Sequence, residues 1–132
     1  MKKIISFNTA GKILLGSFTL LIILHILILL QIIPSSIVWG GQLDGSSSNL
    51  VTMEIIALST TLLFITLTAA RMNLIKLDKF KKVINISMWI IFAYMLLNTL
   101  GNLASGVTAE KLIFTPLTVV MAFCALRLAI EK

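Results

Sequence analysis

Four long apolar stretches dominate the chain, each bounded by charged residues or by Gly, Pro and Ser. They cover about residues 13–33, 50–70, 83–103 and 112–130. A helix rises about 1.5 Å per residue, so about 20 residues match a hydrocarbon core of about 30 Å. Because lipid offers the backbone no hydrogen-bonding partner, each stretch is expected to be a helix. The pattern therefore predicts an all-α fold, a single transmembrane domain over residues 1–132 built as a four-helix bundle.

The amino-acid composition narrows the class of protein further. Of the 132 residues, 58% are hydrophobic and 12% are charged, which is outside the range of ordinary water-soluble domains. The single Cys124 excludes an internal disulfide, and together with the single His25 it leaves no Cys/His cluster at zinc spacing. We therefore expect no cofactor and no metal. The net charge of +6 does not indicate nucleic acid, because the basic residues flank apolar stretches.

The positions of Lys and Arg predict the orientation of the chain. They precede the first stretch, separate the second from the third and end the chain: Lys2, Lys3, Lys12, Arg71, Lys76, Lys79, Lys81, Lys82, Arg127 and Lys132. The other two loops contain only Lys111. By the positive-inside rule both termini are expected in the cytoplasm, with the Gly/Ser-rich loop 34–49 outside. The segment 71–82 either prolongs the second helix or lies along anionic headgroups, and an orientation signal is its simplest interpretation.

The expected location is a bacterial inner membrane, crossed several times. The apolar run after Met1 is too long for a signal-peptide core, so the first helix is expected to be retained. Membrane lipids are the expected partners. A homo-oligomer and a membrane-protein partner both stay open.

This threading places several polar side chains at one outer level. Glu54 lies early in the second stretch, while Asn98 and Asn102 lie late in the third. We predict that these three side chains converge beneath Trp39 and form a ligand-binding pocket. The same layer also holds Gln31, Thr115 and, in the loop, Gly40, Gly41, Gln42 and Asp44. His25, roughly 12 Å below the outer end of the first stretch, and Tyr94 of the third stretch are further candidates for ligand binding.

Helical spacing predicts which faces point inward. The second stretch repeats polar residues every seven positions, at Glu54, Thr61 and Thr68. The fourth stretch carries small residues at spacings that allow close packing: Thr118, Ala122, Ala125 and Ala129. On the third stretch the inward face is expected to hold Ser87, Tyr94, Asn98, Gly101, Asn102 and Ser105.

Each candidate residue also has a structural interpretation. Glu54 either binds a cation, a proton or a ligand donor, or lies wet near a helix N-terminus. His25 either relays protons with Glu54 or, as we favour, bonds to a threonine of the second helix. Trp39 is an interfacial anchor or a lid over the pocket. The two asparagines either bind a ligand or join helices through hydrogen bonds.

The motifs of common enzymes do not occur in the sequence. It contains no glycine-rich phosphate loop, no H-E-x-x-H and no G-x-S-x-G, so we expect a protein that is not an enzyme. Arg127 is expected to reach cytoplasmic headgroups and to have no catalytic role. The most favoured role is small-ligand or lipid binding through the outward-facing pocket. The alternatives are a structural or accessory subunit of a membrane complex and an oligomeric small-solute or proton-coupled transporter.

Several short motifs resemble small four-span bacterial membrane proteins. They are VWGG at 38–41, Glu54, NTLGN at 98–102, and FTPLT at 114–118 followed by Arg127. The resemblance covers most of the chain and implies fold and location, without catalytic residues. The first stretch lacks the glutamate expected of small multidrug exporters, and NTLGN does not restore the fluoride-channel pattern.

Overall fold

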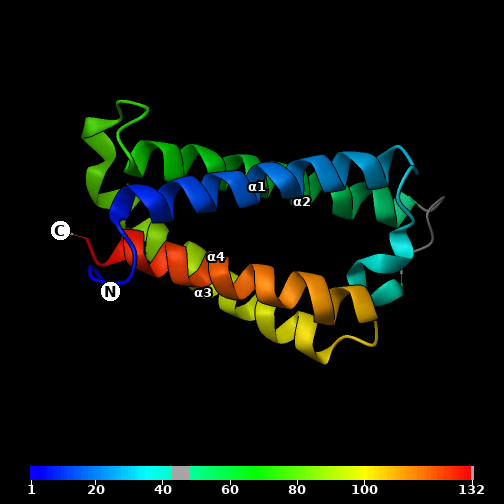
Figure 1. The fold of residues 1–132 in the computed structure, drawn as a ribbon. Helices are drawn as coiled ribbons and strands as arrows, with labels where there is room; N and C mark the ends of the chain where they lie inside the picture. Colours follow the sequence, from blue (N-terminus) through cyan, green and yellow to red (C-terminus); the bar gives the residue numbers. More distant parts are fainter. Residues whose placement is uncertain (43–47, 132) are drawn as a thin grey trace.

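Four antiparallel helices pack as two layers, each made of two helices that follow one another in the chain. In the computed structural model, which describes residues 1–42 and 48–131, the first layer holds α1 (Phe7–Leu29) and α2 (Ser48–Arg71). The second layer holds α3 (Lys81–Ala104) and α4 (Thr115–Ala129), as Figure 1 shows. Asp44 of the predicted loop and Lys132 lie outside the described residues.

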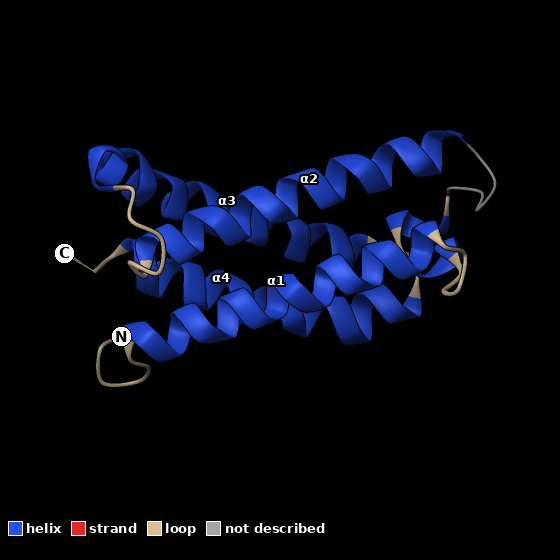
Figure 2. Ribbon diagram, turned by 90° about the horizontal axis from the view of Figure 1, so that it is seen from above, coloured by secondary structure: helices blue, strands red, loops and turns tan. Residues whose placement is uncertain are grey.

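The two ends of the bundle differ in what they contain. Both termini and the connection between α2 and α3 lie at one end, here called the terminal end (Figures 1 and 2). The connections α1–α2 and α3–α4 lie at the other end, here called the loop end. All four helical segments are long and apolar enough to cross a membrane. The expected all-helical class, with four helices long and apolar enough to span a membrane, is thereby confirmed.

The first helix is shifted relative to its prediction. It begins at Phe7 rather than at 13, because the Ser6 side chain caps it by accepting from the Thr9 N–H at 3.1 Å. It ends at Leu29 rather than at 33, and Gln31 follows with a left-handed φ of 57°. Gln31 is consequently exposed beyond the helix and does not belong to the predicted polar layer.

The connection between α2 and α3 is not a helical extension. The second helix ends at Arg71, and Asn73 has a φ of 59°, which no helix continues. A short 3₁₀ turn at Asp78–Phe80 then leads into α3. The expectation that 71–82 prolongs the second helix is therefore wrong.

Most of the predicted inward faces are buried. Glu54, Thr61 and Thr68 of α2 are all buried, as are Thr118, Ala122 and Ala125 of α4. Close contact between α3 and α4 follows from these small residues, and a hydrogen bond of 2.9 Å joins Thr99 to Thr118 across it.

The inward face of α3 is only partly as predicted. Ser87 is buried, but the buried stripe continues through Met88, Ile91, Met95 and Thr99. Tyr94 is 43% exposed and lies at the edge of this stripe. The reason is that α3 packs chiefly against α4, so the face turned to α4 is largely apolar, and most of the predicted polar positions flank it.

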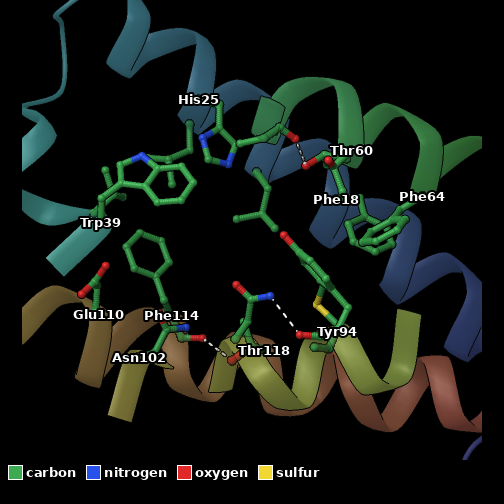
Figure 3. A pocket seen from close by; sticks show the side chains of 17 residues that line it. Phe18, His25, Trp39, Thr60, Phe64, Tyr94, Asn102, Glu110, Phe114 and Thr118 are labelled. Carbon is green, nitrogen blue, oxygen red and sulfur yellow. Dashed lines mark hydrogen bonds between the residues drawn. The ribbon is translucent and has the colours of Figure 1, made fainter. Parts of the chain in front are cut away.

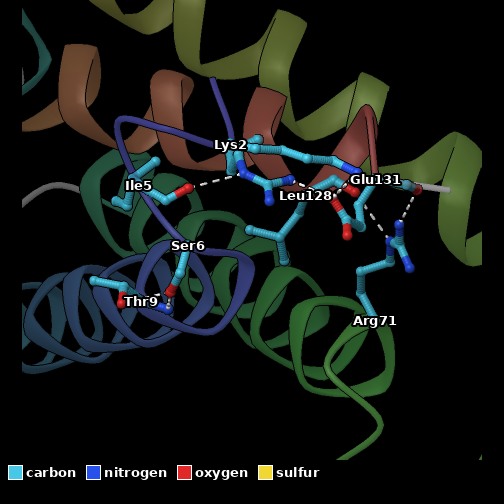
Figure 4. A network of polar contacts seen from close by, with 8 residues as sticks. Lys2, Ile5, Ser6, Thr9, Arg71, Leu128 and Glu131 are labelled. Atoms are coloured by element: carbon cyan, nitrogen blue, oxygen red, sulfur yellow. Dashed lines mark hydrogen bonds and ion pairs between the residues drawn. The ribbon is translucent and has the colours of Figure 1, made fainter.

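A network of charged groups closes the terminal end (Figure 4). Arg127 is 3% exposed; its Nε donates to the Ile5 carbonyl at 3.0 Å and its Nη1 to Glu131 at 2.6 Å. Arg71 donates to the backbone carbonyls of Leu128 and Glu131, at 3.1 and 2.5 Å. The expectation that Arg127 reaches headgroups is wrong, because its guanidinium ties the first residues of the chain to the last turn of α4.

Candidate functional site

A cavity of about 150 Å³ lies between the two layers toward the loop end, and all four helices line it. Its aromatic lining consists of Phe18, Trp39, Phe64, Tyr94 and Phe114. Its polar lining consists of His25, Thr60, Thr61, Asn98, Asn102, Glu110 and Thr118. Figure 3 shows Trp39 and His25 on the side of α1, facing Tyr94, Asn102 and Thr118 on the side of α3 and α4. The cavity is thus both aromatic and rich in hydrogen-bonding groups.

Glu54 lies behind this lining and holds two of its members. The side chain is 0% exposed, and its Oε2 is 2.5 Å from Nδ1 of His25. Its Oε1 accepts from the Trp39 indole N–H at 2.6 Å. Both distances are in the range of charge-assisted hydrogen bonds. The interpretation that Glu54 is wet is therefore wrong, since both of its oxygens are satisfied by protein groups.

The partner of His25 differs from the one that we favoured. We expected a threonine of α2, and the structure gives Glu54, seven residues into the same helix. Thr61 instead donates to its own helix, to the Ala57 carbonyl at 2.7 Å. A threonine hydroxyl bonds readily within its helix, so it competes poorly for a distant histidine.

The turn that carries Trp39 has an unusual backbone. Trp39, Gly40 and Gly41 have φ values of 55°, 65° and 70°, all in the left-handed region. A Cβ on Gly41 would lie 3.3 Å from both the Ser36 carbonyl oxygen and the Val107 side chain. Glycine tolerates both the positive φ of Gly40 and Gly41 and the close approach at Gly41. The turn brings the indole back over the bundle, where it bonds to Glu54.

Glu110 is a site residue that the sequence prediction missed. It is 7% exposed, lines the cavity and accepts from the Gly40 N–H at 3.1 Å. The Ser105 hydroxyl donates to its other oxygen, while the Ser105 oxygen accepts from the Val107 N–H. The acid belongs to a π-helical turn, Glu110–Phe114, which precedes α4. Such turns are often found at functional sites.

The sequence signal for Glu110 is weak. The acid follows residues 105–108, a run with Ser, Gly and Thr, and stands beside Lys111, as an exposed loop residue would. The one usable hint is Pro116, which lies in the first turn of α4 and implies that the preceding residues enter the helix rather than a free loop.

The asparagines have other partners than Glu54. Asn98 and Asn102 both line the cavity, and Asn98 Nδ2 donates to the Tyr94 carbonyl at 2.9 Å. Both oxygens of Glu54 are bonded to His25 and Trp39, so the convergence of Glu54 with the two asparagines stays a prediction. Trp39 contacts Glu54 directly, and Glu110 is the acid that shares the cavity with the amides.

A second hollow of about 460 Å³ adjoins the cavity over the exposed face of α3. Five lining residues are common to both: Trp39, Tyr94, Asn98, Asn102 and Glu110. Leu97 and Gly101, which are exposed, complete its α3 side. The cavity and this hollow are therefore neighbours that have these five lining residues in common.

The chemistry available to this site is hydrogen bonding, charge and aromatic contact. Within residues 1–42 and 48–131, no group of three His, Cys, Asp or Glu side chains is placed to hold a metal ion. Comparisons with protein-family models, with curated proteins and with solved structures find no match, so the geometry alone carries the interpretation of the site.

Proposed function

We propose that the chain is a multi-pass membrane protein that binds a small molecule in the cavity at its loop end. Four helices with the length and composition of membrane spans support the location. The exposed surface supports it too, because large apolar side chains cover it, among them Leu20, Leu62, Leu97 and Leu112 at 55–71% exposure. Apolar patches of this extent are rare on proteins that face water.

The charge distribution supports an orientation with the terminal end in the cytoplasm. Nine of the described Lys and Arg residues belong to the two termini, the first turns of α1 and the α2–α3 connection, whereas Lys111 belongs to the loop end. The positive-inside rule favours the first group on the cytoplasmic side. The cavity then opens toward the outside, which in a bacterium is the outer face of the inner membrane.

The binding proposal depends on one observation, the polar cavity itself. The terminal half of the bundle has a core of apolar side chains. Met88, Ile91, Met121 and Leu128 are all 0% exposed. Filling the loop half in the same way would improve packing and remove buried polar groups that cost free energy. A ligand that contacts those groups gives them a role that packing does not.

The proposal is tested by blocking the cavity. Ala57 lines it, and Phe at this position fills part of its volume; the matched control is Ala93→Phe on the exposed face of α3. Unfolding temperatures are measured in detergent with a panel of cationic, anionic and neutral compounds. A ligand at about 100 times its Kd stabilises a protein by about 2.7 kcal/mol.

We expect at least one compound class to stabilise the unmodified protein and Ala93→Phe but not Ala57→Phe. Equal stabilisation of Ala57→Phe, or no stabilisation by any class, would contradict binding in this cavity.

A further inference from the structure

We infer that the ligand is a small organic cation, about the size of benzene, with Glu110 as its counter-ion. The inference rests on the proposed binding function and names the chemical class of the ligand. Charge, aromatic lining and volume each support it independently.

The first argument is the charge that faces the cavity. Glu110 lines it, whereas no Lys or Arg is found among its described lining residues. Two donors, the Gly40 N–H and the Ser105 hydroxyl, point at this carboxylate, and neither brings a positive charge. A carboxylate offers about four lone-pair sites, so two donors leave acceptor capacity for a ligand. A cation in the cavity would supply the charge that the protein does not.

Glu54 is not the counter-ion. It does not line the cavity, and its oxygens are turned to the His25 ring and the Trp39 indole, which do. Glu54 is therefore a positioning residue, which fixes the orientations of the imidazole and of the indole that face the ligand.

The aromatic lining suits an alkylated ammonium group. The ring of Phe64 lies 5.7 Å from that of Phe18 and 5.2 Å, edge to face, from that of Tyr94. Trp39 and Phe114 line the cavity nearer to Glu110. Aromatic faces attract cations, Trp most strongly, and cages of such rings are a known means of recognising quaternary ammonium ions.

The volume limits the size of the ligand. An engineered protein cavity of about 150 Å³ holds benzene, and the present cavity has about the same volume. A tetramethylammonium group is close to this size. The adjoining hollow leaves room for a short polar tail beside Asn98 and Asn102. Choline therefore has the expected features of charge, head group and tail.

The test compares choline with 3,3-dimethylbutan-1-ol, its neutral isostere, in which carbon replaces the nitrogen. Binding of each is measured by calorimetry with the protein in detergent or in lipid nanodiscs, with tetramethylammonium as a second probe. We expect a quaternary ammonium probe to bind at least tenfold more tightly than the neutral isostere. Glu110→Gln should reduce that preference to about twofold or less, because it removes the charge and keeps the shape.

Glu131→Gln is the matched control, since it removes an acid at the terminal end and should leave the preference unchanged. Equal affinity for choline and its isostere, both lost in Ala57→Phe, would overturn the cation class and leave small-molecule binding standing. Binding of anionic or neutral compounds only would have the same meaning, and loss of all cavity-dependent binding would overturn both proposals. The ratio in the unmodified protein decides the matter even where Glu110→Gln does not fold.

Discussion

The two ends of the bundle treat buried charge in opposite ways. At the terminal end, Arg127 and Arg71 converge on Glu131 and on backbone carbonyls, and the surrounding core is filled. At the loop end, Glu54 and Glu110 are bonded by a histidine and by neutral donors, and a cavity remains between the layers. Among the described residues, no Lys or Arg forms an ion pair with either of these two acids.

The difference separates a structural role from a binding role. Opposite charges that satisfy one another join segments far apart in the sequence, as Arg127 joins Ile5 to Glu131. An acid that lines the cavity and is held by neutral donors, as Glu110 is, stays available to a ligand. The following variants test whether the two ends differ in this way, beginning with the largest expected effect.

Glu54→Ala should have the largest effect, on stability at the loop end. It leaves the ring nitrogen of His25 and the indole N–H of Trp39 without their acceptor and opens a void. We expect a loss of about 3–5 kcal/mol, the range for breaking a buried pair. Thermal unfolding in detergent measures it. A double-mutant cycle with His25→Phe should show coupling of more than about 1 kcal/mol, and additive effects would contradict the pair.

Arg127→Met tests the terminal end. The change keeps the apolar volume but removes the bonds to the Ile5 carbonyl and to Glu131, so we expect a loss of about 2–3 kcal/mol. Limited proteolysis should cut the first residues faster, because Arg127 ties them down. Ligand affinity at the loop end should not change. A fall in affinity without unfolding would show that the two ends are coupled.

Thr118→Val tests the polar contact between α3 and α4. The Thr99 hydroxyl loses its bond to Thr118, so we expect a loss of about 1 kcal/mol in the free energy of unfolding. Thr68→Val is the matched control, because the buried Thr68 hydroxyl has no partner in the described structure. That variant should be neutral or slightly more stable. Equal losses in both would mean that the interhelical bond contributes nothing.

The pH dependence of the terminal end gives the smallest effect. The hydrogen bond from Arg127, with the charges of Arg127, Lys2 and Arg71, lowers the pKa of Glu131 below its usual value. A lowered pKa in the folded state gives stability above the unfolded-state pKa, and this is lost as the pH falls through the folded-state pKa. Above the unfolded-state pKa, the unmodified protein should therefore have a higher free energy of unfolding than Glu131→Gln. In acid unfolding, the free energies of the two proteins should become equal below the folded-state pKa. Parallel curves at all pH values would contradict the shift.

Much of the fold could be predicted from hydrophobic pattern alone. Four apolar stretches of bilayer length require helices, because the backbone satisfies its own hydrogen bonds in that form. The seven-residue repeat of Glu54, Thr61 and Thr68 identifies the buried face of α2, and the small residues of α4 identify its packing face. Helix ends were less predictable, since local caps such as Ser6 set them.

The site was predictable as a set of residues but not as a set of pairs. His25, Trp39, Asn98, Asn102 and Tyr94 do line one cavity, because the α1–α2 and α3–α4 connections lie at the same end of the bundle. The partners of Glu54 depend on how far α1 is displaced along α2, and on the left-handed turn that returns Trp39 to the bundle. Neither quantity is encoded in a hydrophobic pattern.

Sequence by itself determined the helices, their number and their apolar faces, because these follow from local periodicity and from the length of each stretch. Only the tertiary structure decided that Glu54 lies behind the cavity, that Glu110 faces it, and that Arg127 is internal. The physical reason is that burial and hydrogen-bond partners depend on how the α1–α2 layer packs on the α3–α4 layer. The residues that meet there are far apart in the sequence. A single residue beside a turn, such as Glu110, carries no local sign of which way the turn will direct it.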